Sequence, residues 1–418
     1  MCAHCACRKS RSAKAEGRPR DSGNLGCLED SFSRATITLM TKRRMGYFSL
    51  LVFFGALQFY LTIYINSSAI TEALGQSFVT PVFVVAALAS LALFVATPHI
   101  LSSIGNRWMF VALSACVGGA LLVLASAPGG VALFVALALY LACVPLIALS
   151  LDIFFERNLV EEKTAGTSHG LYLTAGNTAL VLSPLMVSLL AGVSFSLVYL
   201  TATVFLIVFL LVALPLARSF RDPVYTHIAI REFPQVLSAH GPVIGAQFIL
   251  RVFYAFATIY MPLLLIERGF SWGEIGVILS IALLPFVLFE LPLGRIADTL
   301  FGEKEMLIAG FILLACVTSL LALSLPLSVP LYALIFFATR TGAAMIEITT
   351  ETNFFRRVGA ADSEAITLFR MTQSGGYLCG ALIGALILFF TSLPSLFVGV
   401  ALLVLCGIPF AYKMQDSR

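Results

Sequence analysis

The sequence has 418 residues, of which 59% are hydrophobic and only 11% are charged. Soluble globular domains carry about 25% charged residues, so this composition excludes a soluble enzyme, a nucleic-acid-binding protein and a disordered chain. The mean hydropathy of +0.97 instead places most of the chain in a lipid bilayer.

Residues 1–44 differ from the rest because they are basic, polar and without an apolar period. We expect a disordered cytoplasmic tail. The alternative is that translation starts later, at Met40 or Met45. Four side chains near the start could ligate a metal but are spaced too closely for the usual zinc pattern. We therefore predict no metal site at Cys2, His4, Cys5 and Cys7.

From Met45 onward, apolar runs of about 20 residues recur, which is the length of a helix that crosses a bilayer. Twelve spans are predicted: 45–69, 76–98, 107–127, 129–153, 165–190, 193–216, 241–265, 272–293, 304–324, 328–350, 363–389 and 393–413. The longest polar interval divides them six and six. The predicted fold class is an all-α membrane protein of two pseudo-symmetric six-helix bundles, 45–216 and 241–413, with a cytoplasmic loop, 217–240, and a cytoplasmic tail, 414–418.

The basic residues predict the orientation. With the N-terminus inside, the cytoplasmic segments hold 22 of the 26 Lys and Arg, and the outside segments hold one, Arg268. An excess of positive charge marks the cytoplasmic side of a membrane protein. We therefore predict a multi-pass protein of the plasma membrane with both termini in the cytoplasm.

The three remaining arginines, Arg251, Arg340 and Arg370, lie within predicted spans. A charged side chain there costs several kcal/mol unless it is paired or hydrated. Three acidic residues of the second bundle also lie in spans, namely Glu290 in the eighth and Glu347 and Glu351 near the inner end of the tenth. Another acidic residue, Asp152, lies at the inner end of its span and is expected to bond Arg157 or Lys163.

Two interpretations of the intramembrane charges are open. In the first, they bind substrate or couple ions, which would assign that role to Arg251, Glu290, Arg340, Glu347 and Arg370. In the second, the arginines form fixed ion pairs with the glutamates. If the arginines face the substrate, they favour an anionic or polyhydroxylated compound.

A polar loop after the eighth predicted span reads Gly294-Arg295-Ile296-Ala297-Asp298-Thr299-Leu300-Phe301-Gly302-Glu303-Lys304. It resembles the signature loop of the major facilitator superfamily, G-x-x-x-D-(R/K)-x-G-(R/K). It departs from that pattern by one extra residue before Gly302 and by Thr299 at a basic position. The corresponding loop after the second span, 98–107, keeps only Gly105 and Arg107.

This resemblance implies a secondary transporter that moves a small molecule by alternating access. It also implies a cytoplasmic gate motif formed by Gly294, Arg295, Asp298, Gly302 and Lys304, with Asp298 facing the start of the fifth span near 164–168. Proton coupling is left open, and so is the alternative of a membrane sensor or assembly factor that kept the fold without transport. We expect a monomer in the lipid bilayer, with no enzyme activity, cofactor, metal or nucleic-acid partner.

Overall fold

The computed structural model describes residues 46–127, 129–158, 165–220, 222, 233–289, 292–293, 302–323, 328–358 and 363–415. Within these ranges almost every residue is helical and there is no strand. A helix satisfies all of its backbone hydrogen bonds within one segment, which is the requirement for a chain that crosses lipid. The predicted all-helical fold class is therefore confirmed.

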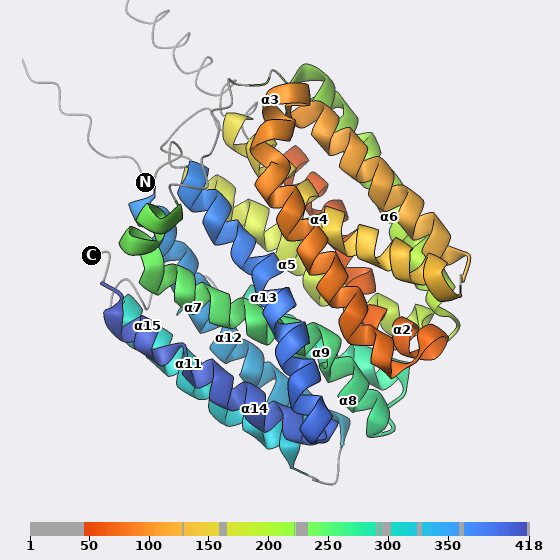
Figure 1. Ribbon diagram of the computed structural model, residues 1–418, viewed down its shortest axis with the longest axis vertical. Coiled ribbons are helices and arrows are strands. Elements are labelled where there is room, and N and C mark those ends of the chain that lie inside the picture. The colour runs from red at the N-terminus through yellow and green to blue at the C-terminus, as the bar shows by residue number, and fades with distance from the viewer. Residues whose placement is uncertain are drawn as a thin grey trace, which may run out of the picture. The chain divides into compact units, whose positions relative to one another are not determined.

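The first half of the chain, defined as residues 48–219, is drawn in red to yellow-green in Figure 1. The apolar stretch Gly46–Leu74, which belongs to this half from Phe48 onward, ends in α2 (Asn66–Leu74). The helices that follow are α3 (Val79–Ala125), α4 (Gly130–Asn158), α5 (Ala165–Leu190) and α6 (Phe195–Ser219), with a 3-10 turn, η1 (Gln76–Phe78), before α3. Helix α3 packs against α4 and α6.

The second half, defined as residues 233–415, is drawn in green to blue in Figure 1. Its helices are α7 (Phe233–Ile259), α8 (Met261–Glu267), α9 (Trp272–Leu288), α11 (Glu303–Ser319), α12 (Val329–Arg357), α13 (Ser363–Phe390), α14 (Leu393–Leu405) and α15 (Ile408–Lys413), with a 3-10 turn, η4 (Leu320–Ala322). Within this half, α7 packs against α12 and α13, and α11 packs against α12 and α14.

Helix α3 is too long for a single crossing. Its 47 residues would extend about 70 Å at 1.5 Å per residue, whereas the hydrocarbon core is about 30 Å thick. The chain turns at Gly105, whose φ of 77° and ψ of 165° are not helical. The sequence predicted a break between two spans over 99–106, and the structure concentrates it at this one glycine.

The described residues contain nine helices long and apolar enough to cross a membrane, one of which Gly105 divides, and two shorter apolar helices, Thr174–Leu190 and Trp272–Leu288. The chain is thus a multi-pass membrane protein. The exact count of twelve spans and the predicted domain boundaries stay predictions, and residues 1–44, 221 and 223–232 lie outside the described residues.

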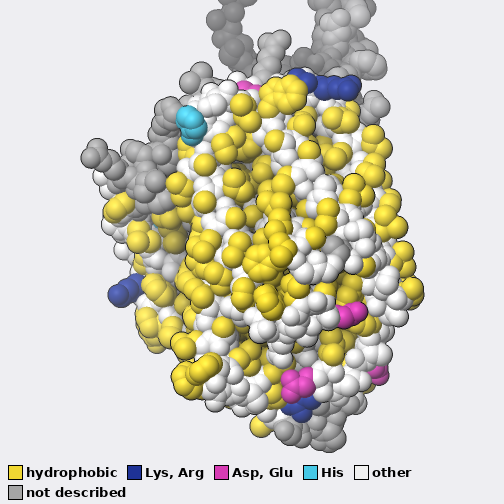
Figure 2. Space-filling view, turned by 45° about the vertical axis from the view of Figure 1, so that its right-hand side comes forward, with side chains coloured by type: hydrophobic (Ala, Val, Ile, Leu, Met, Phe, Trp, Pro, Cys, Tyr) yellow, Lys and Arg dark blue, Asp and Glu magenta, His cyan; other side chains and the backbone are white. Residues whose placement is uncertain are grey.

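Large apolar side chains cover the surface, as a lipid-facing protein requires. Leu189, Phe389 and Leu402 are among the exposed hydrophobic residues. Figure 2 shows one such face, on which hydrophobic side chains predominate and the few charged side chains lie mostly toward its ends. Polar side chains such as Asn66, Gln247 and Arg340 are instead buried between helices. The charged chemistry is therefore inside the bundle.

Candidate functional site

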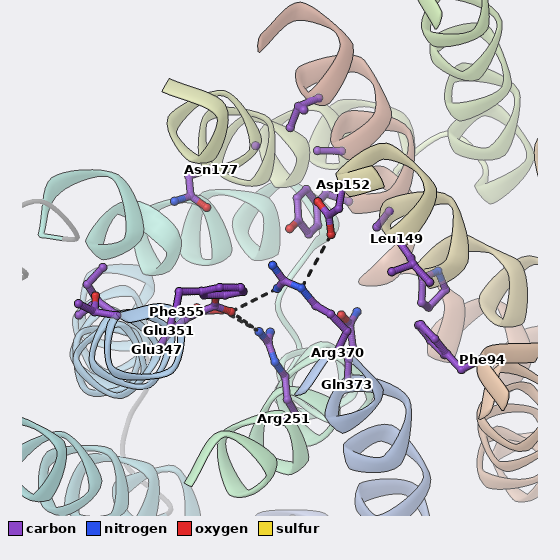
Figure 3. Close-up of a pocket in the computed structure, with 18 residues that line it drawn as sticks. Phe94, Leu149, Asp152, Asn177, Arg251, Glu347, Glu351, Phe355, Arg370 and Gln373 are labelled. Carbon is purple, nitrogen blue, oxygen red and sulfur yellow. Dashed lines mark hydrogen bonds and ion pairs between the residues drawn. The ribbon is translucent and has the colours of Figure 1, made fainter. Parts of the chain in front are cut away.

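A cavity of about 400 Å³ lies between the first helix, α4, α5, α7, α12 and α13 (Figure 3). Its charged lining residues are Asp152, Arg251, Glu347, Glu351 and Arg370. Asp152, Glu351 and Arg370 lie in the parts of their helices nearer the predicted cytoplasmic end. The structure thus brings three of the predicted site residues, Arg251, Glu347 and Arg370, to one cavity.

Arg251 on α7 is held by two glutamates of α12. Its Nη2 lies 3.2 Å from Glu347 Oε1 and 3.6 Å from Glu351 Oε1. The two glutamates are four residues apart, so they share one helix face. The guanidinium also lies over the Tyr254 ring, 5.4 Å from its centroid, and the Tyr254 hydroxyl donates to Glu347 Oε2 at 2.7 Å. Arg251 is therefore a paired charge.

Gln247, one helical turn before Arg251, completes this pairing. With its amide oxygen turned toward Arg251, that oxygen accepts from Nη2 at 2.7 Å and from Nε at 3.1 Å. The amide nitrogen then donates to the Thr350 hydroxyl at 2.7 Å. Sequence reasoning did not single out Gln247 or Tyr254. Gln247 lies four residues before Arg251 and Tyr254 three residues after it, so all three share one helix face, and this spacing could have identified them.

Arg370 on α13 connects the two halves of the chain. Its Nη1 lies 3.3 Å from Glu351 Oε1, and its Nε lies 3.8 Å from Asp152 Oδ2 on α4 (Figure 3). Asp152 thus adds a first-half carboxylate to a network whose other members belong to the second half. The side chains of Arg157 and Lys163, its predicted partners, lie outside the described residues.

Arg340 on α12 is in a different situation. It is 3% exposed, and its guanidinium lies over the rings of Phe253 and Tyr254, 5.5 and 5.7 Å from their centroids. Its Nη2 is 4.0 Å from the Met261 sulfur, and its Nε has no hydrogen-bond partner among the residues that the structure describes. Among the described residues, no carboxylate lies within 4.0 Å of it. Arg340 is therefore a buried cation to which the described residues provide no ion pair.

A second cavity of about 160 Å³ lies against Arg340. Aromatic residues contributed by four helices form much of its wall, namely Phe59, Tyr60, Tyr64, Tyr254, Phe286 and Tyr377. The two cavities have five lining residues in common, namely Tyr60, Asn177, Arg251, Glu347 and Gln373. The paired and unpaired arginines are therefore neighbours in one internal space.

Close helix packing positions this site. A Cβ atom at Gly376 of α13 would lie 2.6 Å from Arg251 Cβ and 2.7 Å from the Arg251 carbonyl carbon. One turn later, a Cβ atom at Gly380 would lie 2.5 Å from Ala255 Cβ. Only glycine permits this approach, as small-residue stripes do between membrane helices. The stripe fixes α13, and with it Arg370, against the backbone of Arg251.

The gate motif is described only at its end. Gly302 is the N-terminal cap of α11, and the Lys304 ammonium lies 5.2 Å from the centroid of the Tyr412 ring. The neighbouring Glu303 is 1% exposed and accepts from Asn353 at 2.6 Å and from Arg356 at 2.9 Å. Four predicted residues lie outside the described residues: Glu290, Gly294, Arg295 and Asp298.

The two halves meet at the end opposite the large cavity. Helix α9 packs on α5 so closely that a Cβ atom at Gly276 would collide with the Pro184 carbonyl oxygen and with Ser188 Cβ. Nearby, the rings of Phe195 and Trp272 meet edge to face, with centroids 5.4 Å apart. Helix α2 also contacts α8. The described helices are thus closed together at this end.

Comparison with known proteins identifies the fold. Residues 243–417 match the model of the Major Facilitator Superfamily. A solved POT family transporter in complex with 5-aminolevulinic acid superposes with a TM-score of 0.73 at 12% identity, covering 88% of this chain and 95% of that one. The fold is that of the major facilitator superfamily. The resemblance predicted from the signature loop is therefore confirmed.

Two further solved transporter structures have the same fold as this chain. The nucleoside transporter NupG superposes with a TM-score of 0.67 at 13% identity, over 88% of this chain and all of that one. A POT family transporter in complex with a thioalcohol-conjugated peptide gives 0.72 at 11% identity, over 88% and 95%. A search of curated proteins finds no match. These findings support membrane transport.

Proposed function

We propose that this protein is a secondary transporter that carries a small organic anion by alternating access, with Arg340 as the substrate-binding cation. One observation supports this proposal most strongly. Arg340 is buried beside a cavity, and it has no carboxylate partner among the described residues. An isolated buried charge is costly, and an anionic substrate would offset that cost. Because Arg251 and Arg370 are already paired, they are better suited to coupling or gating.

The charge balance of the site supports coupling to a proton. Three arginines and three carboxylates, Asp152, Glu347 and Glu351, are described around the two cavities. A bound anion adds one negative charge to this balanced set, and low-dielectric surroundings penalise the excess. Protonation of one carboxylate would restore the balance. We therefore include proton symport in the proposal, with Glu347 as the candidate because it lines both cavities.

The arrangement also supports an inward-facing state. The large cavity lies toward the end that the basic residues predict to be cytoplasmic, and the helices at the other end are packed together. Alternating access requires a second state in which the α5–α9 contact opens and the cytoplasmic ends close. The gate motif of Gly294, Arg295, Asp298, Gly302 and Lys304 would stabilise that second state.

Counterflow in proteoliposomes tests this proposal. A pool of small anionic metabolites is first isolated on an anion-exchange resin. Liposomes containing the full chain are loaded with this pool, and the exchange of its isotope-labelled metabolites is followed by mass spectrometry. The neutral and cationic flow-through serves as the control pool. We expect trans-stimulated exchange of the anionic pool only. Absence of exchange would favour the alternative of a sensor or assembly factor, and flux without trans-stimulation would indicate a channel.

A further inference from the structure

The free edge of one buried guanidinium indicates what kind of anion fits. Arg340 Nε carries an N–H for which the described part of the chain offers no hydrogen-bond partner, and its side chain is almost fully buried. An unsatisfied buried donor destabilises the folded chain, and the Arg340 side chain lines the 160 Å³ cavity. We propose that Arg340 and the surrounding aromatic residues form a subsite for one carboxylate carried on a flat apolar body. This inference rests on the proposed transport of an anion.

The ion pairs of the neighbouring arginines limit the ligand to one negative charge. Arg251 faces Glu347 and Glu351, and Arg370 faces Glu351 and Asp152. Arg340 alone among them has no carboxylate within 4.0 Å in the described part of the chain. A phosphate monoester carries a charge of about −1.5 to −2 at pH 7, more than one free guanidinium balances. A monoanion therefore matches the site.

The shape of the donor favours a carboxylate. A guanidinium presents its Nε–H and one Nη–H as a planar fork that matches the two oxygens of a carboxylate. Hydrogen bonds of this kind would satisfy the orphaned Nε. The guanidinium already lies over the rings of Phe253 and Tyr254, so a carboxylate would bind at its edge.

The walls of the cavity favour a flat body. Tyr60, Tyr64 and Tyr377 line the same space as Arg340, and aromatic faces pack well against flat apolar groups. A cavity of about 160 Å³ suits a body of about one small ring.

Glu347 explains how a second acidic group would be rejected. It lines both cavities, so it lies on the path between the large cavity and Arg340. Protonation of Glu347 balances only one added negative charge, so a second carboxylate on the far side of the ring would leave an uncompensated charge in low-dielectric surroundings. The subsite should therefore discriminate against dicarboxylates.

Ligand binding to the full chain in detergent tests the subsite. The probes are benzoate, its neutral analogue benzamide, the dianion phenyl phosphate, the dicarboxylate terephthalate and the non-planar cyclohexanecarboxylate, each measured by calorimetry and thermal shift. We expect benzoate to bind at least tenfold more tightly than each of the others. Equal binding of benzoate and benzamide would overturn the role of the charge, and preference for phenyl phosphate or terephthalate would overturn the single-carboxylate assignment.

Variants locate the site. Arg340→Gln should abolish benzoate binding. Arg340→Lys should weaken benzoate binding at least tenfold, because lysine lacks the two parallel N–H donors of a guanidinium. Arg268→Gln, which alters an arginine outside both cavities, should leave it unchanged. If Arg340→Gln does not fold, the ligand series on the unaltered chain still decides the proposal. If the anionic pool shows counterflow but benzoate does not bind, the proposed subsite is rejected and the proposed transport stands. If benzoate binds but no counterflow is seen, the proposed transport is rejected and the subsite stands.

Discussion

Arg370 on α13 and Asp152 on α4 form a long ion pair, with Nε 3.8 Å from Oδ2, that joins the two halves across the cavity. Both side chains are partly exposed, at 31% and 30%, so solvent weakens their attraction. The other carboxylate facing Arg370, Glu351, belongs to the same half as Arg370. The Asp152 contact is therefore the member of this network that a movement between the halves would change.

We predict that this pair controls the rate of exchange more than substrate affinity. Asp152→Asn and Arg370→Gln should each slow counterflow, and the double variant should be no slower than the slower single variant. A double-mutant cycle on the rates should give a coupling of at least about 0.5 kcal/mol. Independent, additive effects would show that the pair does not act as a unit. Benzoate affinity should change less than twofold in Asp152→Asn.

The glycine stripe of α13 is predicted to be essential for stability. Gly376→Ala would place a methyl group against the Arg251 backbone, and overpacking of this kind costs about 1–3 kcal/mol. The melting temperature in detergent should fall. The matched control is Gly119→Ala on α3, where a Cβ atom would meet nothing within 4 Å. This control should be neutral or slightly stabilising; equal losses in both variants would contradict the packing argument.

The contact between α5 and α9 is predicted to hold the inward-facing state. Gly276→Ala would force these helices apart at Pro184 and Ser188, which should shift the population toward the opposite state. Leu180 lines the 160 Å³ cavity. In a Leu180→Cys background, Gly276→Ala should make labelling of this cysteine by an impermeant maleimide added outside faster. Gly273→Ala, three residues earlier on α9 and with no contact shorter than 3.8 Å, should leave the labelling rate unchanged.

Asp222, which lies between the two halves, is predicted to cap the helical segment that begins at Asn106. The Asn106 backbone N–H donates to Asp222 Oδ1 at 2.6 Å, directly after the turn at Gly105. Loss of an N-terminal cap costs about 1 kcal/mol, so Asp222→Ala should lower the melting temperature by about 1–3 °C. Glu72→Ala, which removes an exposed acid from α2, is the comparison. An Asp222→Ala variant as stable as that control would exclude the cap.

The fold could be predicted because lipid imposes a simple pattern. Apolar runs of sufficient length and the signature loop led to the confirmed fold, and the depth of Arg251 and Arg340 along their spans placed them near one another. The sequence left substrate binding and ion pairing equally open for these two arginines. The structure separates them, because Glu347 and Glu351 face Arg251 while Arg340 packs on aromatic rings.

What the sequence lacked was the rotation of each helix about its axis. Asp152 lies near a helix end, where it could have faced the basic residues of the next loop or the cavity, and its contact with Arg370 depends on how α4 and α13 face each other. Gly376 decides that placement through backbone contact with α7, and spacing along one helix does not reveal the helix it touches. Glu303 was passed over for the same reason, since its partners Asn353 and Arg356 come from α12.

The edge-to-face contact of Phe195 and Trp272 has a practical consequence. The sequence contains two tryptophans, and the other, Trp108, is 57% exposed and lies just after the turn at Gly105. Trp272 therefore sits at the seam between the halves while Trp108 does not. With Trp108 replaced by phenylalanine, the native fluorescence of Trp272 would report any movement at this contact between the halves without an attached dye.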